Sequence, residues 1–293
     1  MFTATIGFFD GVHKGHRFLI KQLTELAARR NEQAMIITLD VHPRQVVQTS
    51  YVPQLLTLPE EKIALLNETE VDSVVMLNFT REMSLLSSSE FMQMLHEDYD
   101  VDCLLMGYDH RFGHDGGCFS DYVERGQKVG IEVLQATELK EEKVSSRIIR
   151  NLIEDGYILK ANELLGYEFR VTAPVVHGHE VGRSLGFPTA NLSWPEGKIE
   201  PEEGVYAAWA TLPDATRMKA RLNIGCRPTI NYGENVAVEV RILDFDGELY
   251  GLSLTIDFVA KLRDEMRFES KKALIRQLKT DAAIVKQAME EEE

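Results

Sequence analysis

The segment at residues 7–16 reads Gly-Phe-Phe-Asp-Gly-Val-His-Lys-Gly-His, which sets His13 and His16 three positions apart among three glycines. Glycine lets a backbone come close to a ligand, and the N-terminus of a helix offers unpaired N–H groups and a partial positive charge. The two histidines add hydrogen-bond donors for charge that develops on phosphate oxygens. The pattern predicts a triphosphate site, provided that a strand leads into it and a helix leaves it. The alternative is a pair of solvated or capping histidines in an ordinary turn.

The residues on either side of this segment predict that strand and that helix. Residues 3–6 form a short strand-like run, and residues 34–39 form an apolar run suited to a parallel strand that is buried on both faces. Between them, apolar residues recur at steps of three and four, as on the buried stripe of a helix. These residues are Phe18, Leu19, Leu23, Leu26 and Ala27.

The rest of the first half alternates between the two kinds of element. Helices are predicted from Pro59 and from Ser88, and strands at residues 73–77, 101–106 and 131–134. Strands separated by helices predict an α/β domain with an open, parallel, Rossmann-like sheet. Ligands of such sheets bind at the carboxyl ends of the strands, where the histidine segment falls.

The pattern changes after a helix-like segment that ends at Gly166, a residue suited to a helix C-cap. From Phe169 onward the chain favours strict alternation of apolar and polar residues, which predicts an antiparallel β-barrel or sandwich. We therefore expect a domain boundary at residue 167, with domains at 1–167 and 168–293.

Two strands of this second domain are especially clear, at residues 236–242 and 252–258. The residues Phe245–Glu248 between them read as a hairpin turn. A final amphipathic helix over residues 274–285 precedes an acidic tail.

Composition limits the possible partners. The 293 residues include 32 Lys and Arg against 47 Asp and Glu, a net charge of −15, which argues against nucleic acid or an anionic membrane surface. An acidic protein that binds nucleotides must concentrate positive charge locally or recruit a metal ion, and Mg²⁺ is the natural expectation.

The cysteines and the hydropathy pattern bear on the compartment. Cys103, Cys118 and Cys226 are odd in number and widely spaced, which predicts neither a disulfide framework nor a zinc site. No apolar stretch approaches the ~20 residues of a membrane helix, and the first residues do not read as a signal peptide. These features predict a cytoplasmic protein.

Several segments resemble a known family and together cover nearly the whole chain. Residues 7–16 resemble the HxGH signature of nucleotidyltransferases, in the Phe-Asp-Gly-Val-His form of bacterial FAD synthetases. The complete chain resembles the bifunctional riboflavin kinase/FAD synthetase family. The resemblance implies that the second domain phosphorylates riboflavin to FMN. It implies that the first domain adenylylates FMN to FAD and releases pyrophosphate, with ATP and Mg²⁺ used by both domains.

In the first domain, the resemblance implies a site built for alignment and charge neutralisation. The phosphate of FMN is already anionic and pyrophosphate is a good leaving group, so no general base is needed. The implied phosphate-contacting residues are His13 and His16, and the implied nucleotide-binding residues are Gly7, Phe9, Asp10, Gly15, Ser145, Ser146 and Arg150. The implied flavin-binding residues are Asp40, Asp109, Arg111 and Phe112.

Other readings of these residues stay open. Asp40 could be a turn former, Arg111 a surface charge, and the hydroxyls of Ser145 and Ser146 helix caps only. The chain also departs from the family pattern: Arg147 stands where Thr is usual, Phe8 where Asn is common, and residues 116–118 lack an Arg often found nearby.

In the second domain, residues 182–191 resemble the riboflavin-kinase signature that ends in Pro-Thr-Ala-Asn. The resemblance implies that Gly182 and Gly186 belong to a loop over the phosphates, and that Thr189 and Asn191 hold the Mg²⁺–nucleotide through oxygen atoms. An ordinary Gly/Pro turn between strands is the alternative, and it would explain any three of the residues 182–191.

Glu239 lies between Val238 and Val240 on a predicted strand and faces opposite to both. The resemblance implies that its carboxylate is the general base that takes the proton of the riboflavin hydroxyl. A solvent-facing carboxylate is the alternative. Residues 262–268 resemble the family's flap, where Arg263 would reach flavin or phosphate, unless it is a surface cation at a helix end.

These features favour a bifunctional enzyme. One alternative, motivated by Arg147, is a riboflavin kinase with an impaired adenylyltransferase domain. The other is a non-catalytic flavin- or nucleotide-binding regulator.

Overall fold

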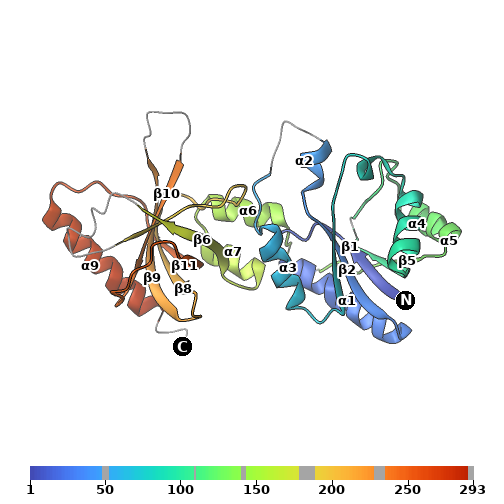
Figure 1. Ribbon diagram of the computed structural model, residues 1–293, viewed down its shortest axis with the longest axis horizontal. Coiled ribbons are helices and arrows are strands. Elements are labelled where there is room, and N and C mark those ends of the chain that lie inside the picture. Colours follow the sequence, from blue (N-terminus) through green and yellow to red (C-terminus); the bar gives the residue numbers. More distant parts are fainter. Residues whose placement is uncertain (48–52, 109, 140–142, 178–188, 228–234, 290–293) are drawn as a thin grey trace. The chain divides into compact units, whose positions relative to one another are not determined.

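The computed structural model describes residues 1–293 except 48–52, 109, 140–142, 178–188, 228–234 and 290–293 (Figure 1). Contacts between residues divide the chain into two compact units, Met1–Ser146 and Arg147–Glu293. The domain boundary at residue 167 therefore stays a prediction. None of the helices in the described residues is long and apolar enough to cross a membrane.

The first unit is built on a five-stranded parallel sheet in the order β3-β2-β1-β4-β5. Its three middle strands are buried almost throughout, as expected for parallel strands that are covered on both faces. This confirms the predicted Rossmann-like sheet. The strands are β1 (Phe2–Ile6), β2 (Gln33–Leu39), β3 (Ser73–Leu77), β4 (Val101–Met106) and β5 (Glu132–Gln135).

Helices cover both faces of this sheet. Figure 1 shows α1 (Lys14–Arg30) and α3 (Pro59–Asn67) on one face, and α4 (Ser88–Tyr99) and α5 (Phe119–Val129) on the other. Right-handed connections require this division, because the chain moves outward from β1 to β3 and then returns across the sheet to β4. Two short helices, α2 (Pro43–Val47) and η1 (Met83–Leu85), lie in the connections.

One buried apolar cluster of the first unit lies between the sheet and α4 with α5. Ala4, Ile37 and Leu104 of the sheet belong to one buried cluster with Met92 and Leu95 of α4. The rigid packing of this cluster fixes the carboxyl ends of β1, β2 and β4, from which the loops of the candidate site leave.

The second unit opens with two helices and continues as a barrel. Helix α6 runs over Ser146–Glu154 and α7 over Ile158–Leu165, and α7 ends at Gly166 with φ 82°, as predicted. Asn162 of α7 fixes the helix to the barrel: its amide donates to the Phe258 carbonyl at 2.8 Å and accepts from the Phe169 N–H at 2.8 Å.

Six strands close the barrel in the order β10-β7-β6-β11-β8-β9, which confirms the predicted antiparallel β-barrel. In β6 the residues alternate strictly between buried and exposed, because one face lines the core and the other faces solvent. The strands are β6 (Phe169–Val176), β7 (Ala190–Leu192), β8 (Gly204–Thr211), β9 (Arg217–Arg227), β10 (Asn235–Ile242) and β11 (Ser253–Arg263).

The hairpin predicted at Phe245–Glu248 is wrong. Strands β10 and β11 are not neighbours, because β10 pairs with β7 and β9 while β11 pairs with β6 and β8. The residues between them form a longer connection that lines a cavity, described below.

The final helix α9 (Lys271–Ala288) packs outside the barrel against β9 (Figure 1). Its Val285 joins a small apolar cluster with Ala207 and Val259 of the barrel. Its Asp281, 1% exposed, accepts hydrogen bonds from Arg221 of β9 and Arg263 of β11. The predicted C-terminal helix is confirmed.

Candidate functional site

The histidine loop joins the end of β1 to the start of α1, as the sequence predicts. His13 is the N-cap of α1, and its Nδ1 accepts a hydrogen bond from the His16 N–H at 3.3 Å. The two rings stack with centroids 3.7 Å apart. Burial, with the positive charge of Lys62 and the nearby His13, holds the pKa of His16 well below its ordinary value, so His16 is neutral near pH 7.

The backbone of the loop is bent sharply. Phe9 and Val12 have φ of 55° and 35°, in the left-handed region that side chains other than glycine rarely adopt. A Cβ on Gly15 would lie 3.2 Å from the His13 ring, so the absence of a side chain lets the helix start close to that histidine. Such strain is typical of a functional loop that the surrounding structure holds in place.

A cavity of about 360 Å³ lies at this loop. It is lined by the histidine loop, by Gly107 and Tyr108 after β4, and by the segment that leads into α6. The volume is in the range of small-molecule sites. Of the predicted residues it brings together His13, Gly15, His16, Ser145 and Ser146.

Asp10, in contrast, holds the loop. It is 3% exposed, and its carboxylate accepts from the backbone N–H and hydroxyl of Thr57 at 3.0 and 3.3 Å. The same Thr57 hydroxyl accepts from the Gly11 N–H at 3.0 Å, and Ser146 donates to the Asp10 carbonyl at 3.0 Å. These bonds join three distant segments around the cavity.

The other predicted nucleotide-binding residues do not line the cavity. Gly7 and Phe9 belong to the backbone of the loop, and Arg150 lies on α6 in the second unit. Their nucleotide-binding roles remain predictions.

Two of the predicted flavin-binding residues, Asp40 and Arg111, lie at different positions in the first unit. The Asp40 carboxylate accepts from the N–H groups of Val41 and Phe79 at 2.7 and 2.9 Å at the end of β2. Arg111 lines a second cavity of about 400 Å³, which also contains Tyr108 and Tyr122. Tyr108 lines both cavities, so the two adjoin at this residue.

Phe112 belongs to the edge of the core. Its ring packs against Phe91 and Tyr122 with centroids 5.4 and 4.7 Å away, and the Tyr122 hydroxyl bonds to its backbone. Asp109 lies outside the described residues. The flavin roles of these residues remain predictions.

Sequence reasoning missed Lys62, which is 1% exposed. It shares the buried stripe of α3 with Leu65 and Leu66 at three- and four-residue spacing. A lysine at an apolar position of a helical stripe was the available signal.

In the barrel, Glu239 of β10 lies directly opposite Asn191 of β7 and Asn223 of β9. Residues opposite each other in antiparallel strands point to the same face, so the three polar side chains form a row. Val238 and Val240 point the other way and are each 1% exposed. This geometry disfavours a freely solvated Glu239, whose side chain is half-buried.

Glu265, a second residue that sequence reasoning missed, joins this row. Its carboxylate accepts from the Asn223 amide at 2.8 Å. It also lies above Gly225, where a Cβ would come within 2.3 Å of a carboxylate oxygen. The missing side chain of Gly225 therefore allows Glu265 to reach Asn223.

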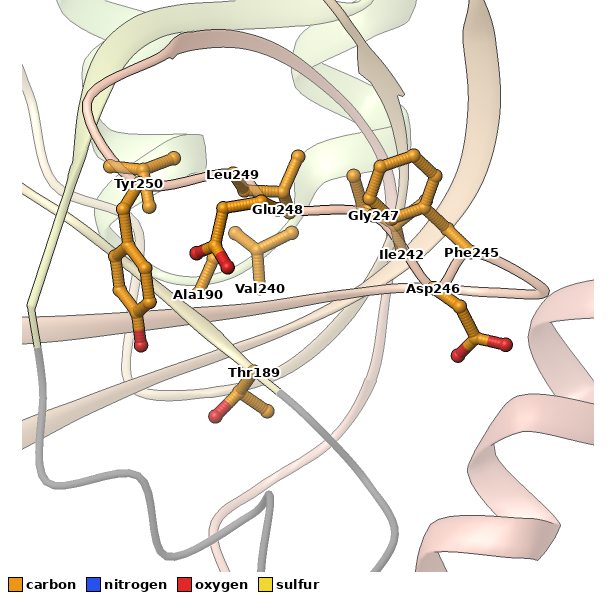
Figure 2. Close-up of a pocket in the computed structure, with 11 residues that line it drawn as sticks. Thr189, Ala190, Val240, Ile242, Phe245, Asp246, Gly247, Glu248, Leu249 and Tyr250 are labelled. Carbon is orange, nitrogen blue, oxygen red and sulfur yellow. The ribbon is translucent and has the colours of Figure 1, made fainter.

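A cavity of about 250 Å³ opens beside Thr189 at the other face of the same strands. Figure 2 shows Thr189 and Ala190 on one side of it and the connection from Phe245 to Tyr250 passing over them. The Tyr250 ring stacks on His177 with centroids 4.1 Å apart. Thr189 lies at the edge of this cavity, with its side chain on the side of the strand away from Ala190 and Val240 (Figure 2), and Asn191 lies beside Glu239.

The remaining predicted residues of the second unit are less directly placed. The Arg263 guanidinium donates twice to Asp281, at 3.1 and 2.8 Å, so most of its donors bind the protein itself, and its role toward flavin stays a prediction. Gly182 and Gly186 lie outside the described residues. Within the described part of the chain, no group of three His, Cys, Asp or Glu side chains could hold a metal ion.

The fold and the two sites define a class of protein. A Rossmann-like unit with a histidine loop at a helix N-terminus, followed by a barrel with a carboxylate beside an Asn and a Thr, is typical of enzymes that transfer phosphorus-containing groups.

Comparisons with known proteins define the family. The FAD synthetase model matches residues 2–148 and the riboflavin kinase model matches residues 165–289. The chain is 33% identical to the bifunctional riboflavin kinase/FMN adenylyltransferase of Listeria monocytogenes, over 94% of this chain and 88% of that protein. It is 34% identical to the protein of the same description from Escherichia coli K12, over 94% and 89%. The chain belongs to the bifunctional riboflavin kinase/FMN adenylyltransferase family.

A solved structure described as a macrolide-efflux protein of Streptococcus pneumoniae shares the fold over both units. Its TM-score is 0.87 at 27% identity, over 97% of this chain and 93% of that one.

Proposed function

We propose that the second unit uses ATP to phosphorylate riboflavin to FMN, and that the first unit transfers AMP from ATP to FMN, which yields FAD and pyrophosphate. Family models for both activities match, one on each part of the chain. The observation that carries the first activity is the stacked pair His13 and His16 at the start of α1, on the wall of a cavity of nucleotide size.

In the first unit, the FMN phosphate oxygen attacks the α-phosphorus of ATP and the bond to pyrophosphate breaks. No proton has to be removed from the attacking oxygen. The neutral His16 and the N-terminus of α1 donate hydrogen bonds to the phosphates and stabilise the developing charge. Asp10 and Thr57 hold the strained loop in position for this task.

In the second unit, the 5′-hydroxyl of riboflavin attacks the γ-phosphorus of ATP and ADP leaves. The hydroxyl proton passes to the carboxylate of Glu239, which Asn191 and Asn223 flank. Thr189 and Asn191 would supply oxygen atoms of the kind that Mg²⁺ prefers. Mg²⁺ held there with the nucleotide would neutralise phosphate charge.

The Tyr250 ring, which stacks on His177, lines the cavity beside Thr189. We infer that part of the nucleotide binds in this cavity and that its phosphates extend past Thr189 to the face of the strands that carries Asn191 and Glu239. The γ-phosphate and the riboflavin hydroxyl would then meet on that face, beside Glu239.

Neither alternative is favoured. A regulator without activity, or a kinase with an impaired adenylyltransferase, gains no support from relatives that match both parts of the chain. Small-molecule substrates fit both activities.

Chromatography of flavins after incubation with riboflavin, ATP and Mg²⁺ tests both activities in one sample. Glu239→Gln should lower FMN formation at least ~100-fold, the scale of a general base, and leave FAD formation from added FMN unchanged. Glu196→Gln, at an exposed position of the same unit, is the matched control. Equal loss of both activities would contradict the role of Glu239.

His16→Ala should lower FAD formation by ~100-fold or more and spare FMN formation. His96→Ala on α4 is the control. Because His13 also caps α1, His13→Asn is the better variant there: asparagine keeps the cap and removes the imidazole. A wild-type rate of FAD formation in both variants would remove the histidines from the mechanism.

A further inference from the structure

Lys62 is buried behind the histidine loop, and the chemistry above gives it no role. Its Nζ donates a hydrogen bond to the Leu39 carbonyl at 2.7 Å, at the end of β2. The same nitrogen lies 3.9 Å from the centroid of the Phe8 ring, which belongs to the loop. The side chain of one residue of α3 therefore contacts both the strand end and the loop.

This contact is unusual in its chemistry. Moving an ammonium group out of water is costly unless partners replace the water, and here one carbonyl and one ring face do so at short range. Two carboxylates, Asp10 and Asp40, add attraction. A methionine of similar length would fill the same space without that cost, so packing alone does not explain a lysine.

The position of the charge suggests its use. The loop has two residues in the left-handed region, Phe9 and Val12, and must present its histidines to a triphosphate in a protein of net charge −15. A fixed positive charge behind the loop offsets part of the repulsion that the phosphates would meet. It also interacts with His16, whose protonation it disfavours.

We propose that Lys62 is a positioning residue for adenylyl transfer: its buried ammonium fixes the histidine loop to the end of β2 and keeps the loop in the arrangement that meets the phosphates. The proposal rests on the adenylyltransferase function of the first unit. Lys62 does not line the cavity, so it acts through Phe8 and the loop.

Because the role depends on charge, it has a pH signature. Burial lowers the pKa of Lys62 to about 8, against the attraction of Asp10 and Asp40. The titratable groups that face it are these two carboxylates and the ring of His16, whose pKa is held well below its ordinary value. FAD formation should therefore decline as the pH rises through about 8 and Lys62 loses its proton.

The first experiment is Lys62→Met in the full chain, with FAD formation from FMN and ATP measured at pH 7. We expect kcat to fall roughly 10- to 100-fold, the scale of a small misplacement of reacting groups, and the remaining rate to lose the decline near pH 8. Riboflavin phosphorylation is the internal control. Lys198→Met is the matched variant, because Lys198 is also 1% exposed and lies 5.0 Å from a Phe169 ring, but in the barrel.

The second experiment separates positioning from stability. Phe8→Leu keeps an apolar side chain but removes the ring face that favours the charged lysine, so the decline should move to lower pH. The pH profile of Phe8→Leu tests the role of the Lys62 charge even if Lys62→Met fails to fold.

Two results would overturn the proposal: a wild-type rate of FAD formation in Lys62→Met, or identical pH profiles for the wild type and Phe8→Leu. A wild-type chain that forms no FAD would instead contradict the proposed function itself.

Discussion

The carboxylate of Asp281 offers a quantitative test of how α9 is held to the barrel. It is 1% exposed and accepts from Arg263, Arg221 and Gln277. In Asp281→Leu, Arg263 can turn toward solvent, since its side chain is 18% exposed, but Arg221 at 7% cannot. An uncompensated charge would remain in the interior. Removing one partner of a buried ion pair lowers the free energy of unfolding by about 3–5 kcal/mol, which corresponds to a fall of roughly 10–15 °C in the melting temperature of a unit of this size.

The double variant Arg221→Met/Asp281→Leu makes the prediction specific. Replacing both charged partners by apolar side chains of similar size is often close to neutral, so the double variant should recover most of the lost stability. The assay is calorimetric unfolding, with loss of riboflavin phosphorylation on heating as the local reporter. A single variant within ~1 kcal/mol of the wild type, or a double variant less stable than the single one, would refute the reasoning.

Two further predictions concern the first unit. Thr57→Val removes the hydroxyl that bonds to both Gly11 and Asp10. The variant should lower the free energy of unfolding of the first unit by about 1–3 kcal/mol and lower FAD formation, while FMN formation is unchanged. Equal rates of FAD formation in variant and wild type would contradict the role of Thr57 in holding the loop. The pKa of His16 is lower in the folded chain than in the unfolded chain. As the pH falls below about 6.5, the imidazole of His16 therefore becomes protonated in the unfolded chain only. The free energy of unfolding then falls by up to ~1.4 kcal/mol per pH unit, until the pH reaches the pKa of His16 in the folded chain. Thermal melts between pH 5 and 7 should show a smaller slope in His16→Gln, and parallel slopes would exclude His16 as the source.

Local patterns predicted the elements well. The strands at Ser73–Leu77 and Val101–Met106 have the predicted bounds, and Gly166 ends its helix in the left-handed region. Each of these features is encoded within a few neighbouring residues. The histidine loop was recognisable for the same reason, because strand, glycines and helix follow one another directly.

Features that depend on distant residues could not be predicted in this way. The residues Phe245–Glu248 have the composition of a turn, but only the strand order shows that they connect strands that are not neighbours. The nucleotide-binding role of Asp10 stays a prediction, and its bond to Thr57, 47 positions away, could not be read from the sequence. Glu265 meets Asn223 across 42 positions. Pairing of this kind is decided by tertiary packing and is invisible to periodicity.

The two units also differ in how their sheets end. The barrel closes on itself, so none of its described strands is left with an unpaired side, whereas β3 and β5 each have a neighbour on one side only. The edge strand β3 reads Ser-Val-Val-Met-Leu, without charge or proline, and its Met76 is 43% exposed. Such an edge can recruit another chain when covering segments loosen. We therefore expect heated or stored preparations to lose FAD synthesis through irreversible aggregation before they lose FMN synthesis. A Lys substituted into β3 should slow this loss of FAD synthesis.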